Sequence, residues 1–563
     1  MKINDWLPKS IQCLSDYNRQ KFLGDVVAGI TVGLVAMPLA MAFAIASGVS
    51  PQAGLYTAII AGFLISFLGG SSTQIGGPTG AFVVVVYGIV ARYGLDGLYM
   101  CTLMAGVLLV ILGMTGLGTA VKFIPRPVVV GFTNGIAVII ASTQIKDFFG
   151  LKVDKVPGEF LARMEALVRN FGTLSPVETA LGVLALLLIL GFTRYVKKVP
   201  GYIVALFVGT AIVVVFKLPV ATIGTRFGGI PSGLPKLRIP QFHVDLVRPL
   251  ISPAVTVAML GAIESLMSAV VSDRMSGDCH NPNVELVAQG VANMFSPLFG
   301  GLPATGAIAR TATNIRSGAK TPVAGIVHAL ILLAILLFAA PLARFIPLSV
   351  LAAILFVVAY NMGEWREIPK LWKLSRLEIG TWAITFLLTV FADLTVAVEV
   401  GMILAALVFI RKVTSTTTVS QVTDEYLRKG YAHTLQNKEI PSYVTIFRIH
   451  GPFLFGATDK IDEILSRIPE LPPIIILRLR NMTAIDSTGL QALEKLADAV
   501  YSSGRGLILC GAREQPARLM KQAEFEQRVG AENISHSVAE ALERAKSLYA
   551  LISAPRVARV TPD

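Results

Sequence analysis

Two Gly- and Pro-rich stretches interrupt the apolar part of this 563-residue sequence: GGPTGA at 76–81 and GGLPATGA at 300–307. Extended backbone survives at membrane depth only inside protein or along a cavity. We therefore expect 71–78 and 300–304 to be extended segments inside the molecule. A short helix would begin after each segment, with Thr as its N-cap and Gly letting the backbone approach a ligand closely.

These two helix starts have the chemistry of an anion site. The amino end of a helix carries roughly half a positive charge and free N–H groups. Two such ends that face one small space would therefore bind an anion. The residues assigned to this site are Thr79, Gly80, Ala81, Thr305, Gly306 and Ala307. The alternative interpretation is that both stretches are ordinary helix kinks.

Glu264 is an acid in the middle of an apolar run, AIESLMSAV. A carboxylate at membrane depth is costly and usually functional. An ionised Glu264 would repel an anion, whereas a protonated one would not, and burial favours the neutral form of a carboxyl group. Glu264 is thus the candidate for coupling proton uptake to anion binding. Alternatively, it is a structural acid bonded to Ser265, Ser268 or unwound backbone.

Arg310 lies five residues into the second short helix and is the one basic residue expected at depth. It could neutralise a bound anion, or it could be the permanent partner of Glu264 or Asp393. Phe43 follows Pro38, which breaks the first apolar run, and its ring could line the cavity, although a Phe in a span more often only packs. A last set at helical spacing, expected to hold the second extended segment in place, consists of Asn283, Glu285, Gln289 and Asn293.

The composition identifies an integral membrane protein. Hydrophobic residues make up 54% and charged residues 15% of the chain, whereas soluble domains carry about 25% charged residues. Apolar runs of roughly 17–25 residues, the length that crosses a bilayer, recur until about Arg411, and ordinary soluble sequence begins after Lys412. The expected parts are a cytosolic segment at 1–23, a transmembrane domain at 24–412, a linker at 413–440, an α/β domain at 441–550 and a tail at 551–563.

Fourteen membrane segments are expected. They lie at about 24–47, 53–69, 79–92, 97–117, 128–145, 176–193, 201–216, 253–272, 284–298, 305–316, 322–341, 347–362, 378–391 and 395–411. Several, such as 79–92 and 305–316, are too short to cross alone at about 1.5 Å per residue. If the amino terminus is cytoplasmic, the basic clusters between spans also fall in the cytoplasm, as the positive-inside rule requires. An even number of crossings returns the carboxyl terminus there.

The net charge of +13 is explained by those basic clusters, so no nucleic-acid partner is expected. The four cysteines and six histidines have no metal-binding spacing, and we expect no metal, cofactor or disulfide framework. The amino terminus has no cleavable signal peptide pattern, so the first span should be permanent. The sequence has no Walker-type phosphate loop, so ATP-driven transport is not expected. The chain is also not expected to be an enzyme.

The two stretches belong to an internal repeat. Thr79-Gly80-Ala81 aligns with Thr305-Gly306-Ala307 at an offset of 226 residues, and the same offset aligns 36–42 with 262–268. Seven spans separate the copies, so the repeats, at about 24–216 and 253–411, have opposite orientations. Inverted repeats are typical of secondary transporters, whose site lies near the membrane midplane.

At this level the sequence resembles the sulfate permease (SulP) family of anion transporters. The matching stretches are VAMPLAMAFAIASGVSPQAGLYTA (35–58), GGPTGAF (76–82), IESLMSAVVSDRMSG (263–277) and the long run at 281–325. The resemblance implies two inverted seven-span repeats divided into a core and a gate domain, with elevator-like movement of the core. It places the anion between the third and tenth spans, among Phe43, Thr79–Ala81, Glu264 and Thr305–Arg310.

The sequence also departs from the family pattern. Leu39 stands where many eukaryotic members have Gln after the first-span proline, and Ala309 stands where some relatives have Ser beside the arginine. A side-chain donor to the substrate is missing at Leu39, which leaves the identity of the anion open.

The carboxyl-terminal part reads as an α/β domain, with strands expected at 443–449, 474–480 and 506–511. The stretch NMTAIDSTGL (481–490) resembles the STAS domain of SulP proteins, in which Ser487 matches a phosphorylated serine of related regulators. The alternative role of this stretch is helix capping in a packing and dimerisation module.

These observations favour a secondary transporter of a small anion, such as sulfate, bicarbonate or a dicarboxylate, working by proton symport or anion exchange. The alternatives are an uncoupled anion channel, a nucleobase permease, or a signalling protein anchored by its membrane part. The expected setting is the inner membrane of a bacterium, with both termini cytoplasmic and the chain a homodimer. Its partners would be the lipid bilayer, the anion, and protons or a counter-anion.

Overall fold

The computed structural model describes residues 6–116, 118, 125–153, 156–196, 200–231, 233–237, 243–373, 376–392, 394–422 and 440–553. The chain forms two compact units, Met1–Ala405 and Ala406–Asp563. Asp393, most of the expected linker and the last ten residues lie outside the described part of the chain.

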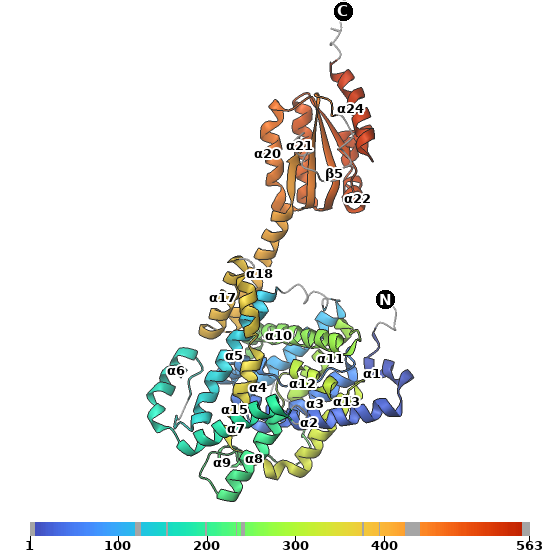
Figure 1. The fold of residues 1–563 in the computed structure, drawn as a ribbon. Coiled ribbons are helices and arrows are strands. Elements are labelled where there is room, and N and C mark those ends of the chain that lie inside the picture. The colour runs from blue at the N-terminus through green and yellow to red at the C-terminus, as the bar shows by residue number, and fades with distance from the viewer. Residues whose placement is uncertain are drawn as a thin grey trace, which may run out of the picture. The chain divides into compact units, whose positions relative to one another are not determined.

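The first unit is helical (Figure 1). Its first half contains α1 (Lys9–Gln12), α2 (Arg19–Ala46), α3 (Pro51–Leu68), β1 (Gly76–Gly77), α4 (Gly80–Met114), α5 (Arg126–Phe149), α6 (Phe160–Arg169), α7 (Pro176–Tyr195), α8 (Gly201–Phe216) and α9 (Ile223–Phe227). Its second half contains α10 (Val244–Ser276), α11 (Pro282–Phe295), β2 (Thr305–Gly306), α12 (Ile308–Arg316), α13 (Val323–Ala334), α14 (Ala340–Ala343), α15 (Leu348–Met362), α16 (Ile368–Trp372), α17 (Arg376–Phe391) and the first part of α18 (Leu394–Thr416), which continues into the second unit.

Each of the fourteen expected membrane segments overlaps a helix of the structure. The third and fourth segments share α4, which breaks at Gly94, a residue with non-helical φ of 70° and ψ of −170°. Among the described residues, eight helices are long and apolar enough to cross a bilayer, and Gly201–Phe216 is a shorter apolar helix. The exact number of crossings remains a prediction, because α11 and α12 are too short to cross alone.

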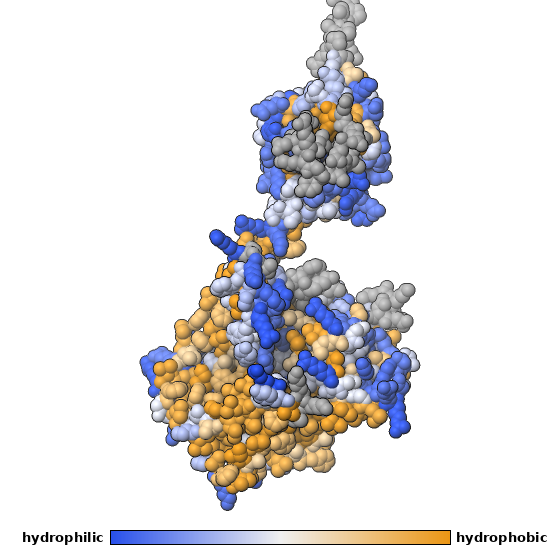
Figure 2. Space-filling view, in the orientation of Figure 1, coloured by the Kyte–Doolittle hydropathy of each residue, from blue (hydrophilic) through white to orange (hydrophobic). Residues whose placement is uncertain are grey.

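The surface of this unit is apolar over a wide area (Figure 2). Large hydrophobic side chains are exposed along α7, α8 and the π-helical segment after α13 (Ile335–Ala339), among them Leu187, Phe207, Phe216 and Phe338. Soluble proteins rarely expose contiguous apolar patches of this kind. This surface therefore faces lipid.

The membrane helices pack in two groups. One group contains α2, α3, α4 and α10 to α13, and the other contains α5, α7, α8, α15 and α17. Small residues allow the close crossings. A Cβ at Gly106 of α4 would lie 2.7 Å from the carbonyl oxygen of Gly290 of α11, and a Cβ at Gly131 of α5 would lie 2.6 Å from that of Trp382 of α17. The grouping agrees with the core and gate domains implied by the family resemblance.

The expected extended segments meet inside the first group. β1 and β2 pair antiparallel, with Gly76 opposite Gly306 and Gly77 opposite Thr305. The Ala307 N–H also donates to the carbonyl oxygen of Ile75 over 2.8 Å. Because the two segments pair with each other, their backbone groups are satisfied away from lipid, as membrane depth requires.

The second unit is an α/β domain with a five-stranded sheet in the order β3-β4-β5-β6-β7. The strands are β3 (Thr418–Gln421), β4 (Val444–Phe453), β5 (Ile474–Ile485), β6 (Gly506–Cys510) and β7 (Ile534–Ser535). The helices are α20 (Asp459–Arg467), α21 (Ser487–Ser502), α22 (Glu514–Gln522), α23 (Phe525–Val529) and α24 (Val538–Ser553). β3 is antiparallel to β4, and the other neighbouring strands are parallel.

The three strands expected from the sequence correspond to β4, β5 and β6. β3 was not expected, because its sequence TVSQ lies in the stretch that reads as a polar linker and has no apolar run. Its position at the edge of the sheet explains why a polar strand suffices there.

Candidate anion-binding site

The two short helices begin on either side of the β1–β2 pair. β1 leads through Pro78 and Thr79 into α4 at Gly80, and β2 leads through Ala307 into α12 at Ile308. Since the two strands are antiparallel, the chain enters the two helices from opposite directions. Their amino ends therefore lie at opposite ends of the two-residue β1–β2 pair, within the first helix group. This is the arrangement that the repeated breakers predict.

The two threonines do not cap these helices as expected. Thr79 occupies the N-cap position of α4, but its side chain makes no capping bond. Its hydroxyl instead donates to Glu264 Oε2 over 2.9 Å. Thr305 lies in β2, its hydroxyl donates to the carbonyl oxygen of Gly261 over 2.8 Å, and Ala307 is the N-cap of α12.

The capping prediction was wrong because acceptors on α10 bind both hydroxyl groups. Neither helix receives a side-chain cap, so its first N–H groups keep their capacity to donate to an anion. Gly80, Ala81 and Gly306 are buried, whereas Ala309 of α12 is exposed. The amino end of α12 thus borders an open space.

Glu264 is placed on α10 opposite the start of α4. The structural partners proposed for it from the sequence are bonded elsewhere. Ser265 Oγ donates to Glu285 Oε1 over 3.2 Å, and Ser268 Oγ lies 3.1 Å from Thr311 Oγ1. The Glu264 carboxyl group instead accepts a hydrogen bond from the Thr79 hydroxyl group.

Arg310 is buried beneath the first extended segment. Its Nη2 donates to the carbonyl oxygen of Pro78 over 2.8 Å, and a Cβ at Gly77 would lie 2.6 Å from its Nη1. Among the described residues, no ion pair joins Arg310 to Glu264. Asp393, the other partner proposed for Arg310, lies outside the described residues. The guanidinium group therefore adds positive charge just before the amino end of α4.

An apolar wall covers the start of α4. A Cβ at Gly80 would lie 2.5 Å from Met362 Sδ, 3.1 Å from Ile140 Cδ1 and 3.3 Å from Phe43 Cε1. Phe43 is almost fully buried, and its ring lies beside the start of α4. Ile140 of α5 and Met362 of α15 were missed, since an apolar side chain in a span carries no signal that separates site from packing.

A cavity of about 1050 Å³ reaches toward this wall. Met267, Val271 and Arg274 line it, and at helical spacing they share a face of α10 with Glu264. Asn361 and Gly363, the neighbours of Met362, line it as well. The further basic residues around it are Arg126, His280 and Arg366. The cavity thus opens at the end of the molecule that the positive-inside rule assigns to the cytoplasm.

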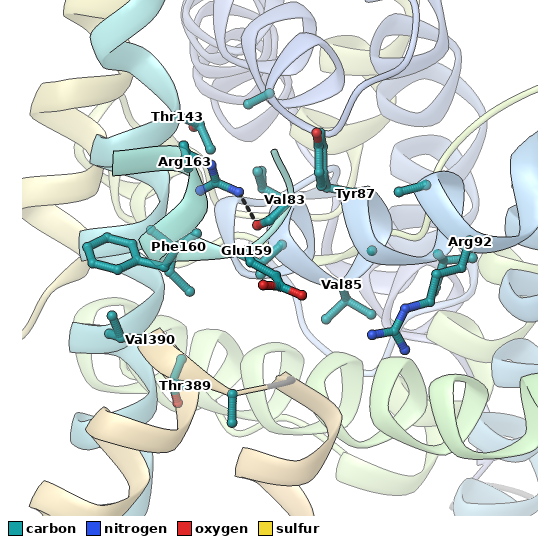
Figure 3. Close-up of a pocket in the computed structure, with 18 of the residues that line it drawn as sticks. Val83, Val85, Tyr87, Arg92, Thr143, Glu159, Phe160, Arg163, Thr389 and Val390 are labelled. Atoms are coloured by element: carbon teal, nitrogen blue, oxygen red, sulfur yellow. Dashed lines mark hydrogen bonds between the residues drawn. The ribbon is translucent and has the colours of Figure 1, made fainter. Parts of the chain in front are cut away.

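A second cavity, of about 580 Å³, lies beyond the other end of the first α4 segment. Tyr87, Arg92 and Glu159 line it, and Figure 3 shows the Glu159 carboxyl group pointing into it. Arg163 of α6 is buried there, donating to the carbonyl oxygens of Pro157 and Gly158 and to Ser142 Oγ. The sequence did not identify Arg163 as buried, because it lies in a stretch that reads as a long outer loop.

The polar stripe of α11 holds the extended segments, as expected. Glu285 accepts from the Gly70 N–H over 2.9 Å, which fixes the start of the first segment. The Asn293 side chain bonds both the N–H and the carbonyl oxygen of Ala304, each over 2.8 Å. These side chains act on the backbone of the site and lie behind it.

In the second unit, Ser487 is the first residue of α21 and is exposed. The capping role belongs to Asp486, whose side chain accepts from the N–H groups of Gly489 over 2.7 Å and Phe455 over 3.0 Å. Among the described residues, no group of three or more His, Cys, Asp or Glu side chains could hold a metal ion.

Paired helix amino ends, buried among apolar helices that face lipid, define a polytopic membrane transport protein. The comparisons with known proteins agree. Residues 22–385 match the sulfate permease family, and residues 434–541 match the STAS domain. The chain belongs to the sulfate permease family and is an anion transporter, not an enzyme.

The individual relatives support this assignment over most of the chain. YvdB of Bacillus subtilis (strain 168), a candidate sulfate transporter, is 42% identical over 91% of this chain and 96% of its own length. The bicarbonate transporter BicA of Picosynechococcus sp. is 32% identical over 93% of this chain and 94% of its own.

Two solved structures share the fold. The transmembrane domain of a cyanobacterial bicarbonate transporter BicA aligns with a TM-score of 0.62 at 35% identity, over 68% of this chain and 98% of that chain. The overall structure of SLC26A9 aligns with a TM-score of 0.87 at 19% identity, over 98% of this chain and 94% of that chain.

Proposed function

We propose that this protein is a secondary active transporter that moves one small anion between the facing amino ends of α4 and α12. The observation that carries the proposal is the β1–β2 pair, which brings the two ends together. Uncapped N–H groups and the nearby Arg310 guanidinium group supply the positive potential. The anion would be sulfate, bicarbonate or a dicarboxylate, and the names of the relatives support the first two.

The coupling ion we propose is the proton, taken up at Glu264. The Thr79–Glu264 bond supports this proposal because it places the carboxyl group against the start of α4. An ionised Glu264 there would repel an incoming anion. Protonation would remove that repulsion, so proton and anion would move together. Exchange for a counter-anion at the same site is the alternative form of coupling.

The movement we propose is of the elevator type. The helices that hold the paired ends form one group, and Met362 and Ile140, which cover the start of α4, belong to the other group. Displacement of the first group against the second would uncover the site alternately toward the cavity beside Arg274 and toward the cavity beside Arg92. We further propose a homodimer in a bacterial inner membrane, with both termini cytoplasmic and Ser487 available for regulation.

Uptake into proteoliposomes tests this function. Labelled sulfate, bicarbonate and fumarate are offered with and without an inward proton gradient. Accumulation of one anion that rises with the gradient supports proton symport, and stimulation by internal anion supports exchange. A current independent of any proton or counter-anion gradient would establish the channel alternative. Uptake of labelled uracil by the same proteoliposomes would establish a nucleobase permease.

A further inference from the structure

His328 of α13 is a fully buried histidine with no hydrogen-bond partner on either ring nitrogen in the described part of the chain. Arg310 Nη1 and Ser66 Oγ are buried and unpaired as well. Buried polar groups in proteins are almost always bonded to protein or to ordered water. Several unpaired groups within one helix group therefore indicate a site that something else fills.

These groups lie behind the β1–β2 pair. A Cβ at Gly62 of α3 would lie 3.1 Å from the carbonyl oxygen of Gly76 and 3.8 Å from His328 Nδ1. A methyl group at Gly62 would therefore point into the gap between the Gly76 carbonyl oxygen and the His328 ring, in tight contact with the carbonyl oxygen. Arg310 Nη1 lies beside Gly77, the next residue of β1.

Ser66 marks the same contact between α3 and α13. It lies one turn beyond Gly62 on α3, and a Cβ at Gly325, almost one turn before His328, would lie 2.1 Å from Ser66 Oγ. The unpaired atoms thus come from α3, α12 and α13, and the Gly76 carbonyl oxygen adds an acceptor from β1.

The chemistry of this set selects the ligand. An imidazole ring offers one donor and one acceptor when neutral, a guanidinium group offers donors only, and a carbonyl oxygen accepts. An anion would be repelled by the carbonyl oxygen, and a cation by Arg310. Water both donates and accepts, so it suits donors and acceptors together.

We propose that one or more buried water molecules join His328 to the Gly76 carbonyl oxygen and to the Arg310 guanidinium group. Through this water His328 is a positioning residue of the anion site. It holds β1 and Arg310 in place from behind, while the amino ends of α4 and α12 face the anion. The role in transport rests on the proposed function, whereas the water itself does not.

The variants separate the water from the side chain. Gly62→Ala adds a methyl group that would crowd a water between the Gly76 carbonyl oxygen and His328, and it leaves the His328 side chain unchanged. His328→Phe removes both ring nitrogens, and His328→Gln keeps one donor and one acceptor. The matched control is Gly191→Ala on α7, where a Cβ meets nothing within 4 Å.

The first measurement needs no substrate. In ¹⁵N-histidine-labelled protein in lipid, solid-state NMR should show magnetisation transfer from water to the ring signal that His328→Gln removes. Gly62→Ala should abolish this transfer, and Gly191→Ala should preserve it. A wild-type His328 ring without transfer from water, or transfer that survives Gly62→Ala, overturns the buried-water site whatever the protein transports.

The second measurement is uptake of the anion found in the proteoliposome panel. Losing an ordered, bridging water weakens binding, so Gly62→Ala and His328→Phe should raise KM about fivefold with the maximal rate nearly unchanged. His328→Gln should stay within about twofold of wild type. Equal loss in His328→Gln and His328→Phe, or wild-type KM in Gly62→Ala, would overturn the positioning role.

Discussion

The Thr79 hydroxyl donates to Glu264 Oε2 over 2.9 Å and so joins the amino end of α4 to the middle of α10. The same threonine closes the extended segment that pairs with β2, and Thr305 makes the corresponding bond to α10 through the Gly261 carbonyl oxygen. Both arms of the candidate site are therefore anchored to one helix. A change in the charge of Glu264 acts directly on the helix start that would bind the anion.

Replacing Glu264 with Gln should separate proton coupling from anion binding. The amide oxygen of Gln can still accept from Thr79, so the geometry should persist, while the proton-accepting group is lost. We expect uptake driven by a proton gradient to fall about tenfold or more, and anion affinity to change less than about threefold. Uptake with and without the gradient, and anion binding to purified protein, measure the two effects.

The control for this experiment is Thr79→Ser, which keeps the hydroxyl donor and should retain coupling. Proton coupling that is unchanged in Glu264→Gln would remove Glu264 from the mechanism. A loss of anion binding as large as the loss of uptake would instead show that Glu264 has a structural role.

The two breaker glycines should differ in their tolerance of a side chain. A Cβ at Gly306 would lie 1.6 Å from Gln74 Nε2, which is bonded to both the carbonyl oxygen and the hydroxyl group of Ser265. A Cβ at Gly80 meets the end of the Met362 side chain, which can turn away. We expect Gly306→Ala to abolish transport and Gly80→Ala to lower it, with both proteins still inserted.

The double variant Gly80→Ala with Met362→Ala tests the physical cause. Removing the thioether makes room for the new methyl group, so transport should recover relative to Gly80→Ala alone. Normal uptake by both single variants would show that close backbone approach is not needed. If transport does not recover in the double variant, the methyl group at position 80 clashes with a group other than Met362.

Met362 should be reachable from the larger cavity and should be covered by the anion. In a cysteine-free background, Met362→Cys is expected to react with a charged methanethiosulfonate reagent from that side, and bound anion should slow the reaction several-fold. Val270→Cys is the matched control, because Val270 lines the same cavity on α10. Its labelling should not respond to the anion, and equal protection at both positions would contradict a local contact.

The breakers, the repeat and Glu264 could be found in the sequence because Gly, Pro and charge are rare signals in apolar surroundings. Ile140 and Met362 carry no such signal, since their place at the site depends on how α5 and α15 pack on α4. The Thr caps failed for a related reason. A local preference for capping lost to acceptors on α10, which is distant in the sequence.

Arg163 of α6 shows the same limit, in a stretch whose sequence reads as a loop. Its sequence neighbours indicate an outer surface, yet the guanidinium group is buried and bonded to the carbonyl oxygens of Pro157 and Gly158. Those acceptors are displayed only once the loop has folded around them. The buried positive charge of Arg163 could therefore not be predicted from residue spacing alone.

The amino-terminal segment should stay attached to the helix ends across the ordinary pH range. Lys9 Nζ lies 3.0 Å from Asp278 Oδ1, and Ser72 donates to the same carboxyl group. Burial opposes ionisation of Asp278, but the hydrogen bonds from Ser72, the Cys279 N–H and Lys9 outweigh it and lower its pKa from 3.8. The contribution of Asp278 to this attachment is therefore complete above its unfolded pKa and is lost only as pH falls through the lower, folded value.

Hydrogen exchange of the peptide around Lys9 measures this attachment. Protection should be constant between about pH 5 and about pH 8 once the intrinsic exchange rate is corrected. Asp278→Asn and Lys9→Ala should each reduce it, whereas Glu165→Gln, which removes an exposed ion pair with Arg169 on α6, should not. Protection that fades near pH 6 would contradict the lowered pKa, and full protection in Asp278→Asn would show that Ser72 and the backbone hold the segment without the charge.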